Sequence, residues 1–199
     1  MIAPTDLLWA SIGLILTIGG TFIEASIATP TLSWSQHGIA IRSLEVSYQV
    51  GAVLLVSCVG GKNAGALSQI AYLTLGLTWL PVFSQGGGLS YFQEPSFGYL
   101  VGFIPGAWVC GFLAFKGRPR LETLAFSCVC GLACIHLAGL SYLLVTHLFN
   151  WAPGGTIPLM EVTLKYSVYH LKGQLAVACA ATVLAFVLRK ILFLDSPKY

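Results

Sequence analysis

Residues 175–188 read LAVACAATVLAFVL and contain no charged side chain. Residues 12–18, IGLILTI, form a similar unbroken apolar run near the N-terminus. A transmembrane β-strand needs about 10 residues in which apolar and polar side chains alternate, and neither run alternates. Inside lipid every backbone amide must be paired, and a helix pairs its amides within one segment. The two runs therefore predict membrane-spanning helices.

The composition of the whole chain agrees with these runs. Of its 199 residues, 56% are hydrophobic and 9% are charged, and the mean hydropathy is +0.82. Soluble domains usually carry about 25% charged residues. One crossing takes about 20 apolar residues, so the chain has room for roughly six crossings. We expect an all-α, polytopic membrane protein with a single membrane domain over residues 1–199.

Polar stretches and turn-forming residues divide the chain into six apolar segments. We expect helices at about residues 7–25, 48–59, 64–83, 97–115, 121–149 and 166–193. Residues 26–47 are polar and too many for an ordinary helix–helix connection, so we expect a long loop there. Residues 84–96 and 150–165 form the other two longer loops, and such loops are often functional.

Basic side chains predict the orientation of the helices. Seven of the ten Lys and Arg residues fall on one face of the predicted bundle: Lys62, Lys116, Arg118, Arg120, Arg189, Lys190 and Lys198. Cytoplasmic connections carry an excess of Lys and Arg, so this face and both termini are expected to be cytoplasmic. That arrangement requires an even number of crossings, in agreement with six. The basic face could dock a partner or contact anionic lipid, and the second interpretation needs no partner.

The sequence carries no enzyme motif. It lacks HExxH, a P-loop and a Ser-His-Asp arrangement, so we expect no catalysis and no cofactor. Cys128, Cys130 and Cys134 have a spacing like that of metal ligands, but zinc motifs usually place paired cysteines on polar turns. Because the three lie in an apolar run, we expect them to pack between helices without a metal. The histidines do not pair in depth as two haem ligands would, and His136 is expected to hydrogen-bond a neighbouring helix.

Lys172 is the most informative charge, because it lies in the first turns of the sixth apolar segment. A lysine at that depth extends to the interface, pairs with an acid or binds an anion. Extension to the outer interface is the simpler interpretation, and a bound carboxylate is the alternative. Gln49 and Gln174 carry amides that could contact a polar ligand group near the same outer ends.

Aromatic side chains gather near these outer ends: Tyr48, Tyr91, Phe92, Phe97, Tyr99, Phe103 and Trp151. They are typical either of an interfacial aromatic belt or of an apolar pocket with a few aimed polar groups. The Gly86-Gly87-Gly88 run would let backbone approach a ligand closely, or let the loop open and close.

Four segments between residues 47 and 115 occur in the order and spacing of one family. Residues 47–55, SYQVGAVLL, are similar to FTLQTLAVLL, and residues 60–65, GGKNAG, are similar to the turn LGPRLG. The pieces LGL, LPVF and GGG within residues 75–88 are similar to LLGLAGLPVFAGGGGG, and residues 94–103, EPSFGYLVGF, are similar to GPTGGYLLGF. In these segments the chain resembles the BioY family, the substrate-binding membrane subunits of bacterial biotin transporters of the energy-coupling-factor type.

The resemblance implies a six-helix fold in the bacterial cell membrane, with the vitamin bound near the outer face. It implies three kinds of partner: biotin or a related small carboxylate, a transmembrane coupling subunit, and two cytoplasmic ATPases whose ATP hydrolysis drives transport. By resemblance, the pocket-forming stretches contain Gln49, residues 86–88, Ser96 and Tyr99.

In the family, the sixth helix begins with PGDxxK, whose Asp and Lys hold the ligand. Here Lys172 matches the Lys, and Tyr169 stands in place of the Asp. Two glycines of GPTGGYLLGF are replaced, and the Ala-x-x-x-Ala pattern that often contacts the coupling subunit is missing, because Leu14 follows Ala10. These departures favour an alternative function, a BioY-like protein that has lost transport and serves as an accessory or assembly subunit of a larger membrane complex.

The predicted ligand-binding residues have three roles. Lys172 would pair with the ligand carboxylate, Gln49 and Tyr99 would hydrogen-bond the ligand, and the others would line the cavity. The full set is Gln49, Phe83, Gly86, Gly87, Gly88, Tyr91, Ser96, Tyr99, Phe103 and Lys172.

Replacement of the lysine tests this assignment. A charge-assisted contact contributes roughly 1.5–3 kcal/mol, so Lys172→Ala is predicted to weaken biotin binding by about tenfold or more. Equilibrium binding of biotin to the purified protein measures the effect. A variant that binds as tightly as the wild type would contradict the role assigned to Lys172.

Overall fold

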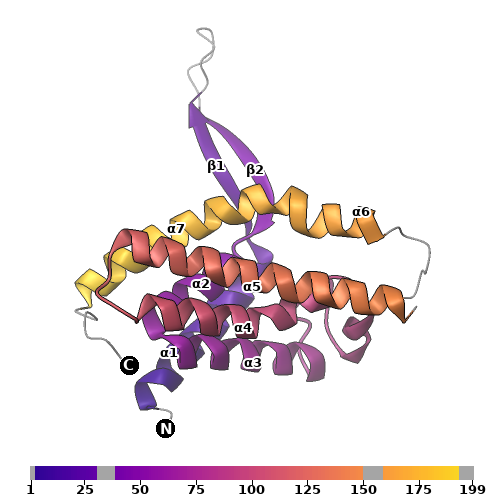
Figure 1. Ribbon diagram of the computed structural model, residues 1–199, viewed down its shortest axis with the longest axis horizontal. Helices are drawn as coiled ribbons and strands as arrows, with labels where there is room; N and C mark the ends of the chain where they lie inside the picture. Colours follow the sequence, from indigo (N-terminus) through magenta and orange to yellow (C-terminus); the bar gives the residue numbers. More distant parts are fainter. Residues whose placement is uncertain (1–2, 31–38, 150–158, 193–199) are drawn as a thin grey trace.

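The computed structural model describes residues 3–30, 39–149 and 159–192. The helices are α1 (Pro4–Phe22), α2 (Gln49–Gly60), α3 (Lys62–Thr78), α4 (Phe97–Ala114) and α5 (Leu121–Leu148), with a 3₁₀ helix, η1 (Leu89–Gln93), before α4. The last helical element consists of α6 (Leu159–Thr163), a π-helical turn, η2 (Leu164–Tyr169), and α7 (His170–Ile191). The helices labelled α3, α4, α5 and α7 run alongside one another as a bundle (Figure 1).

Within the described residues, four helical segments are long and apolar enough to cross a membrane: Pro4–Phe22, Phe97–Ala114, Leu121–Leu148 and Met160–Ile191. The prediction of a mostly helical membrane protein is therefore confirmed. The helices α2 and α3 have 12 and 17 residues, which is shorter than the roughly 20 residues of an ordinary crossing. The count of six crossings and the cytoplasmic termini stay predictions.

The short helix α2 lies in the core of the bundle. It contacts α1, α3, α4 and α7, and Val53, Leu54 and Cys58 on it are fully buried. Since protein rather than lipid surrounds it, the thickness of the bilayer does not set its length. Its N-terminal end follows strand β2 directly, and this end contributes Gln49 and Val50 to the cavity described below.

The helices α4 and α5 pack closely because glycines recur every four residues on α4. These glycines are Gly98, Gly102 and Gly106, and each faces a residue of α5. A Cβ atom at Gly106 would lie 2.6 Å from Cγ1 of Ile135 and 2.9 Å from the carbonyl oxygen of Gly131. Small residues at this spacing let two membrane helices approach to backbone distance. This close packing holds Ile135 of α5 in place, and Ile135 lines the cavity described below.

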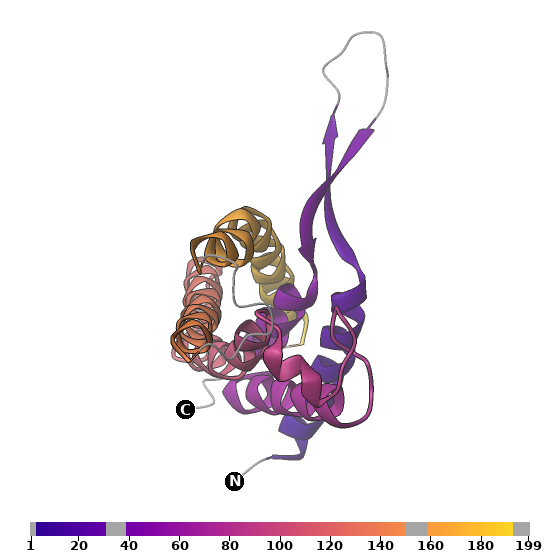
Figure 2. The same cartoon turned by 90° about the vertical axis from the view of Figure 1, so that its right-hand side faces the viewer.

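The polar stretch 26–47, predicted to be a loop, instead forms most of an antiparallel ribbon. Strand β1 (Glu24–Pro30) pairs with β2 (Ile39–Ser47), and Figures 1 and 2 show the ribbon projecting from the bundle as a narrow arm. An all-α chain was therefore the wrong prediction for this segment. A projecting segment still has to pair its backbone amides, and two strands pair them with each other. Residues 31–38, which include His37, lie outside the described residues.

The base of the ribbon is fixed to α7. Ala25, Val46 and Val177 form a small buried cluster there. The pairs Glu24↔Ser47 and Ser26↔Ser43 show that β2 contains extra residues at this point. Glu45 lies among them and has φ 56°, which is uncommon for a residue other than glycine. A bulge of this kind redirects side chains, and it directs Glu45 towards the cavity.

The last helical element begins earlier than predicted. Residues 159–165 were expected to belong to a loop that starts at residue 150, but they form α6 and the start of η2. Residues 150–158, with Trp151, lie outside the described residues. The earlier start places a π-helical turn immediately before α7, and this turn contributes Tyr166 to the cavity.

A bulkier residue on the glycine face of α4 should destabilise the bundle. Gly106→Leu places a side chain where Ile135 and backbone already lie, and overpacking of this kind costs about 1–3 kcal/mol. The matched control is Gly19→Leu on α1, where nothing lies within 4 Å of an added Cβ. Thermal unfolding in detergent should show a lower midpoint for Gly106→Leu alone. Equal midpoints for the two variants would contradict the packing described.

Candidate functional site

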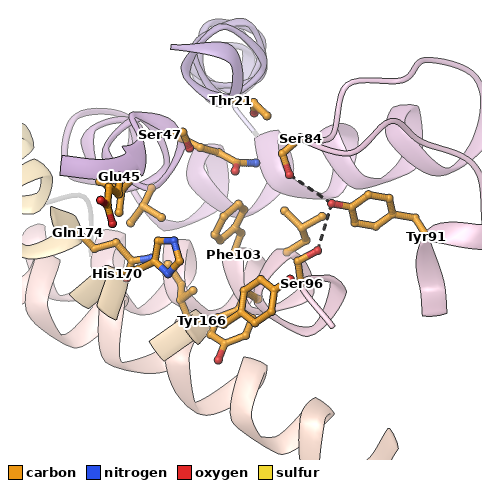
Figure 3. A pocket seen from close by; sticks show the side chains of 16 residues that line it. Thr21, Glu45, Ser47, Ser84, Tyr91, Ser96, Phe103, Tyr166, His170 and Gln174 are labelled. Carbon is orange, nitrogen blue, oxygen red and sulfur yellow. Dashed lines mark hydrogen bonds between the residues drawn. The ribbon is translucent and has the colours of Figure 1, made fainter. Parts of the chain in front are cut away.

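A cavity of about 270 Å³ lies where the base of the ribbon meets the N-terminal ends of α2, α4 and α7 (Figure 3). Small-molecule sites usually measure about 300–1,000 Å³, so this one suits a small ligand. It is lined by Thr21, Glu45, Val46, Ser47, Gln49, Val50, Ser84, Tyr91, Ser96, Tyr99, Leu100, Phe103, Ile135, Tyr166, His170 and Gln174.

Polar groups lie at the two ends of the cavity, and apolar groups lie between them. Figure 3 shows one end formed by Glu45, His170 and Gln174, and the other by Ser84, Tyr91 and Ser96. Val50, Leu100 and Phe103 belong to the apolar part of the lining. An apolar cavity with a few polar groups at defined points is the usual form of a small-molecule site.

The loop between α3 and α4 supplies the second polar end. Tyr91 places its hydroxyl 3.2 Å from Oγ of Ser96 and 3.5 Å from Oγ of Ser84. Two glycines shape the loop, because Gly86 and Gly88 have φ values of 110° and 94°, which side chains rarely tolerate. The amide of Gly88 donates to the carbonyl of Gly76 (2.8 Å), which attaches the loop to α3.

The wall formed by α2 carries a fixed amide. Gln49 donates from Nε2 to the hydroxyl of Tyr72 (2.9 Å), and Tyr72 donates to the carbonyl oxygen of Val82 (3.0 Å). Gln49 and Tyr72 are both buried. The amide therefore has one orientation, set by a tyrosine that lies behind the cavity wall.

The wall formed by α7 carries a second amide whose orientation is fixed by a hydrogen bond. Oε1 of Gln174 lies 2.7 Å from Nε2 of His136 on α5. Nδ1 of the same imidazole lies 3.4 Å from Oγ of Ser167, and the hydroxyl of Tyr99 lies 2.6 Å from that oxygen. These hydrogen bonds connect α4, α5, η2 and α7 behind the cavity. They agree with the expectation that His136 hydrogen-bonds a neighbouring helix.

Five of the ten predicted site residues line this cavity: Gln49, Tyr91, Ser96, Tyr99 and Phe103. Phe83 and residues 86–88 are not part of its lining. Phe83 is buried and packs against Tyr91, with ring centroids 4.6 Å apart, so it supports a lining residue from behind. That any of the ten contacts a ligand stays a prediction.

Lys172 is exposed and is not part of the lining, whereas His170 and Gln174, two residues before and after it, are. Two residues correspond to about 200° around a helix, so Lys172 lies on the side of α7 away from the cavity. The role predicted for Lys172 therefore has no counterpart in the geometry of this cavity, and it stays a prediction.

Sequence reasoning did not assign Thr21, Glu45, Ser47, Tyr166 or His170 to the site. A signal existed for two of these, because Tyr166, His170 and Gln174 are spaced four residues apart and such residues share a helix face. For Glu45 the sequence carried no signal, since its direction depends on the bulge in β2. Within the described part of the chain, the lining contains one carboxylate, Glu45, and no Lys or Arg.

Three thiols meet away from the cavity, at the junction of α2, α4 and α5. Sγ of Cys58 lies 3.5 Å from Sγ of Cys110 and 3.6 Å from Sγ of Cys128. Structural zinc takes four ligands, and the described residues bring three thiols together here. The buried contacts are those of small side chains that pack between helices. Cys130 and Cys134, predicted to pack in the same way, are half-buried.

Comparisons with known proteins give a family. A sequence model of the BioY family matches residues 3–193. The chain is 29% identical over 186 residues to an uncharacterized 21.2 kDa protein encoded in the psbX-ycf33 intergenic region of Cyanophora paradoxa, and the match covers 94% of this chain and 95% of that protein.

Biotin transporters match over shorter segments. The chain is 38% identical over 108 residues to a probable biotin transporter BioY of Lysinibacillus sphaericus and 40% identical over 102 residues to the biotin transporter BioY of Thermotoga maritima. These matches cover 54% and 51% of this chain, and 55% and 60% of the two relatives. The chain thus aligns with little more than half the length of these transporters.

A solved structure shares the fold. The S-component for biotin from an ECF-type ABC transporter superposes with a TM-score of 0.68, over 93% of this chain and 90% of that chain. The sequence identity is 20%, so the likeness concerns the fold alone.

Proposed function

Because this chain belongs to the BioY family, we propose that it is the substrate-binding membrane subunit of a biotin uptake system. The cavity at the base of the ribbon is the proposed site. Support comes from the matched biotin transporters and from the polar–apolar–polar lining of the cavity.

The chemistry of biotin fits such a lining. The molecule has a ureido group with N–H donors and a carbonyl at one end, an apolar thioether ring and alkyl chain in the middle, and a carboxylate at the other end. Val50, Leu100 and Phe103 would cover the apolar middle. The side-chain amides and hydroxyls at the two ends would hydrogen-bond the ureido and carboxyl groups, because buried polar groups of a ligand need partners.

The proposed orientation places the cavity near the outer face of the bacterial cell membrane. The lining residues come from the N-terminal ends of α2, α4 and α7. Seven of the ten Lys and Arg residues lie elsewhere along the chain, with Arg118 and Arg120 between α4 and α5 and Lys190 at the C-terminal end of α7; Arg42, Lys165 and Lys172 are the exceptions. An excess of Lys and Arg favours the cytoplasmic side, which supports six crossings with cytoplasmic termini.

Transport would need partners, because the sequence carries no nucleotide-binding motif. We propose a transmembrane coupling subunit and ATPases of the energy-coupling-factor type. Co-purification from native membranes tests this part separately from ligand binding. Recovery with ATPase subunits supports it, and recovery with an unrelated membrane complex, without ATPases, would favour an accessory or assembly role instead.

Filling the cavity should abolish capture of the vitamin. Val50→Trp puts an indole ring into the space of 270 Å³, and the resulting overlap with the ligand should weaken biotin binding by at least about tenfold. The matched control is Val183→Trp on the exposed side of α7. Equilibrium binding of biotin measures the effect, and thermal unfolding shows that both variants are folded. Wild-type protein without biotin affinity, or equal binding by the two folded variants, would contradict the proposed site.

A further inference from the structure

Gln49 and Gln174 each bring a side-chain amide to the cavity, and the two amides have opposite orientations: one turns its oxygen and the other its NH₂ group towards a ligand. For Gln49 the chemistry of its partners decides the orientation. The hydroxyl of Tyr72 lies 3.0 Å from the carbonyl oxygen of Val82 and 3.2 Å from Oγ1 of Thr21, which donates its own proton to a backbone carbonyl, so one of these two oxygens accepts the Tyr72 proton. The tyrosine oxygen must then accept from Gln49, and only the NH₂ side of the amide can donate. Oε1 of Gln49 is therefore the edge left for a ligand, and it is an acceptor.

For Gln174 the orientation is the reverse. Oε1 is next to Nε2 of His136, so this nitrogen carries the imidazole proton and donates it. Nδ1 is then an acceptor for the hydroxyl of Ser167, and Ser167 accepts in turn from Tyr99. Each donor in this chain of hydrogen bonds has one acceptor. The NH₂ side of Gln174 is the edge left for a ligand, and it is a donor.

The same end of the cavity contains one carboxylate, that of Glu45, and one imidazole, that of His170. Glu45 and His170 lie beside Gln174 (Figure 3), and the described lining includes no Lys or Arg. His170 makes its own hydrogen bond from Nδ1 to the carbonyl oxygen of Lys165. Lys172 is exposed on the other side of the helix. The α7 wall thus offers a ligand oxygen an uncharged donor where a lysine would offer a cation.

We infer that this cavity selects its ligand by two oppositely oriented amides: Gln49 accepts an N–H of the ligand, and Gln174, held by His136, donates to an oxygen at the ligand's other end. The inference rests on the proposed function and adds to it a substrate class. The site accepts ureido compounds whose side chain ends in any oxygen acceptor, whether a carboxylate or its neutral carboxamide.

Biotin and biotinamide distinguish this class from a site built around a cation. Both keep a terminal C=O, but only biotin carries a charge. The wild type should bind biotinamide at least as tightly as biotin, because Glu45 adds a carboxylate at this end of the cavity (Figure 3), whereas a cationic partner would favour the carboxylate by about tenfold or more. Biotin binding with rejection of biotinamide would overturn the inference and leave the proposed function intact. Failure to bind either would overturn both.

A negative charge added at Gln174 gives the sharper test. Gln174→Glu keeps an oxygen for His136 and replaces the donor edge by a carboxylate, which repels the carboxylate of biotin. Biotin affinity should fall by about tenfold or more while biotinamide affinity falls less, so that the preference for biotinamide over biotin increases. The matched control, Gln93→Glu, adds the same charge at an exposed position outside the lining and should leave both affinities unchanged. Unchanged preference in Gln174→Glu would contradict the inference.

Lys172→Ala belongs in the same experiment. The sequence alone predicts a loss of about tenfold or more for this variant. The amide-based site predicts instead that it binds biotin within about twofold of the wild type, because removal of a side chain outside the cavity removes no contact. A loss of affinity of about tenfold or more for biotin, without a loss for biotinamide, would show that Lys172 and not Gln174 recognises the carboxylate.

His136 acts as a positioning residue, and a double-mutant cycle tests that role. His136→Leu should weaken binding several-fold in the wild-type background, because the amide of Gln174 loses its orientation, and should have little further effect in Gln174→Leu. His136→Gln, which can still donate an N–H, should retain part of the affinity. A loss of equal size in both backgrounds would mean that His136 only supports the fold.

Discussion

A buried polar side chain that lacks a hydrogen-bond partner costs free energy, so most polar side chains inside a helical bundle are paired within the protein. This constraint shapes the centre of the molecule. Tyr72 finds the carbonyl oxygen of Val82 and so fixes Gln49, while His136 fixes Gln174 across a helix contact. Once these partners are assigned, only certain polar edges remain for a ligand, and the recognition chemistry of the cavity follows from the packing of the bundle.

Close helix contact makes those hydrogen bonds possible. The glycines of α4 bring α5 to backbone distance, which puts Tyr99 and His136 on either side of Ser167 at hydrogen-bonding range. The base of the ribbon closes the cavity from another side, since the bulge at Glu45 and the cluster around Val46 hold it against α7. Stability and ligand selection therefore depend on the same few contacts.

Much of the fold could be predicted from the sequence, because long apolar runs such as residues 175–188 have few alternatives in a membrane. The ribbon was missed, since its Ser, Thr and Pro residues are equally typical of a loop. The site was predicted best where the helix ends are regular, at Gln49, Ser96 and Tyr99. It was predicted less well in the loop before α4, where Phe83 and residues 86–88 lie outside the lining, and in α7, where Lys172 lies outside it. The four-residue spacing of Tyr166, His170 and Gln174 indicated the cavity side of α7, but the prediction followed the lysine of the family pattern instead.

The most direct test of the account is a high-resolution structure of the purified chain with biotin bound. The account predicts density for the vitamin inside the cavity, with a ureido N–H next to Oε1 of Gln49 and a carboxyl oxygen next to Nε2 of Gln174. Biotin bound outside this cavity, or inside it with its carboxylate held by Lys172, would contradict the account.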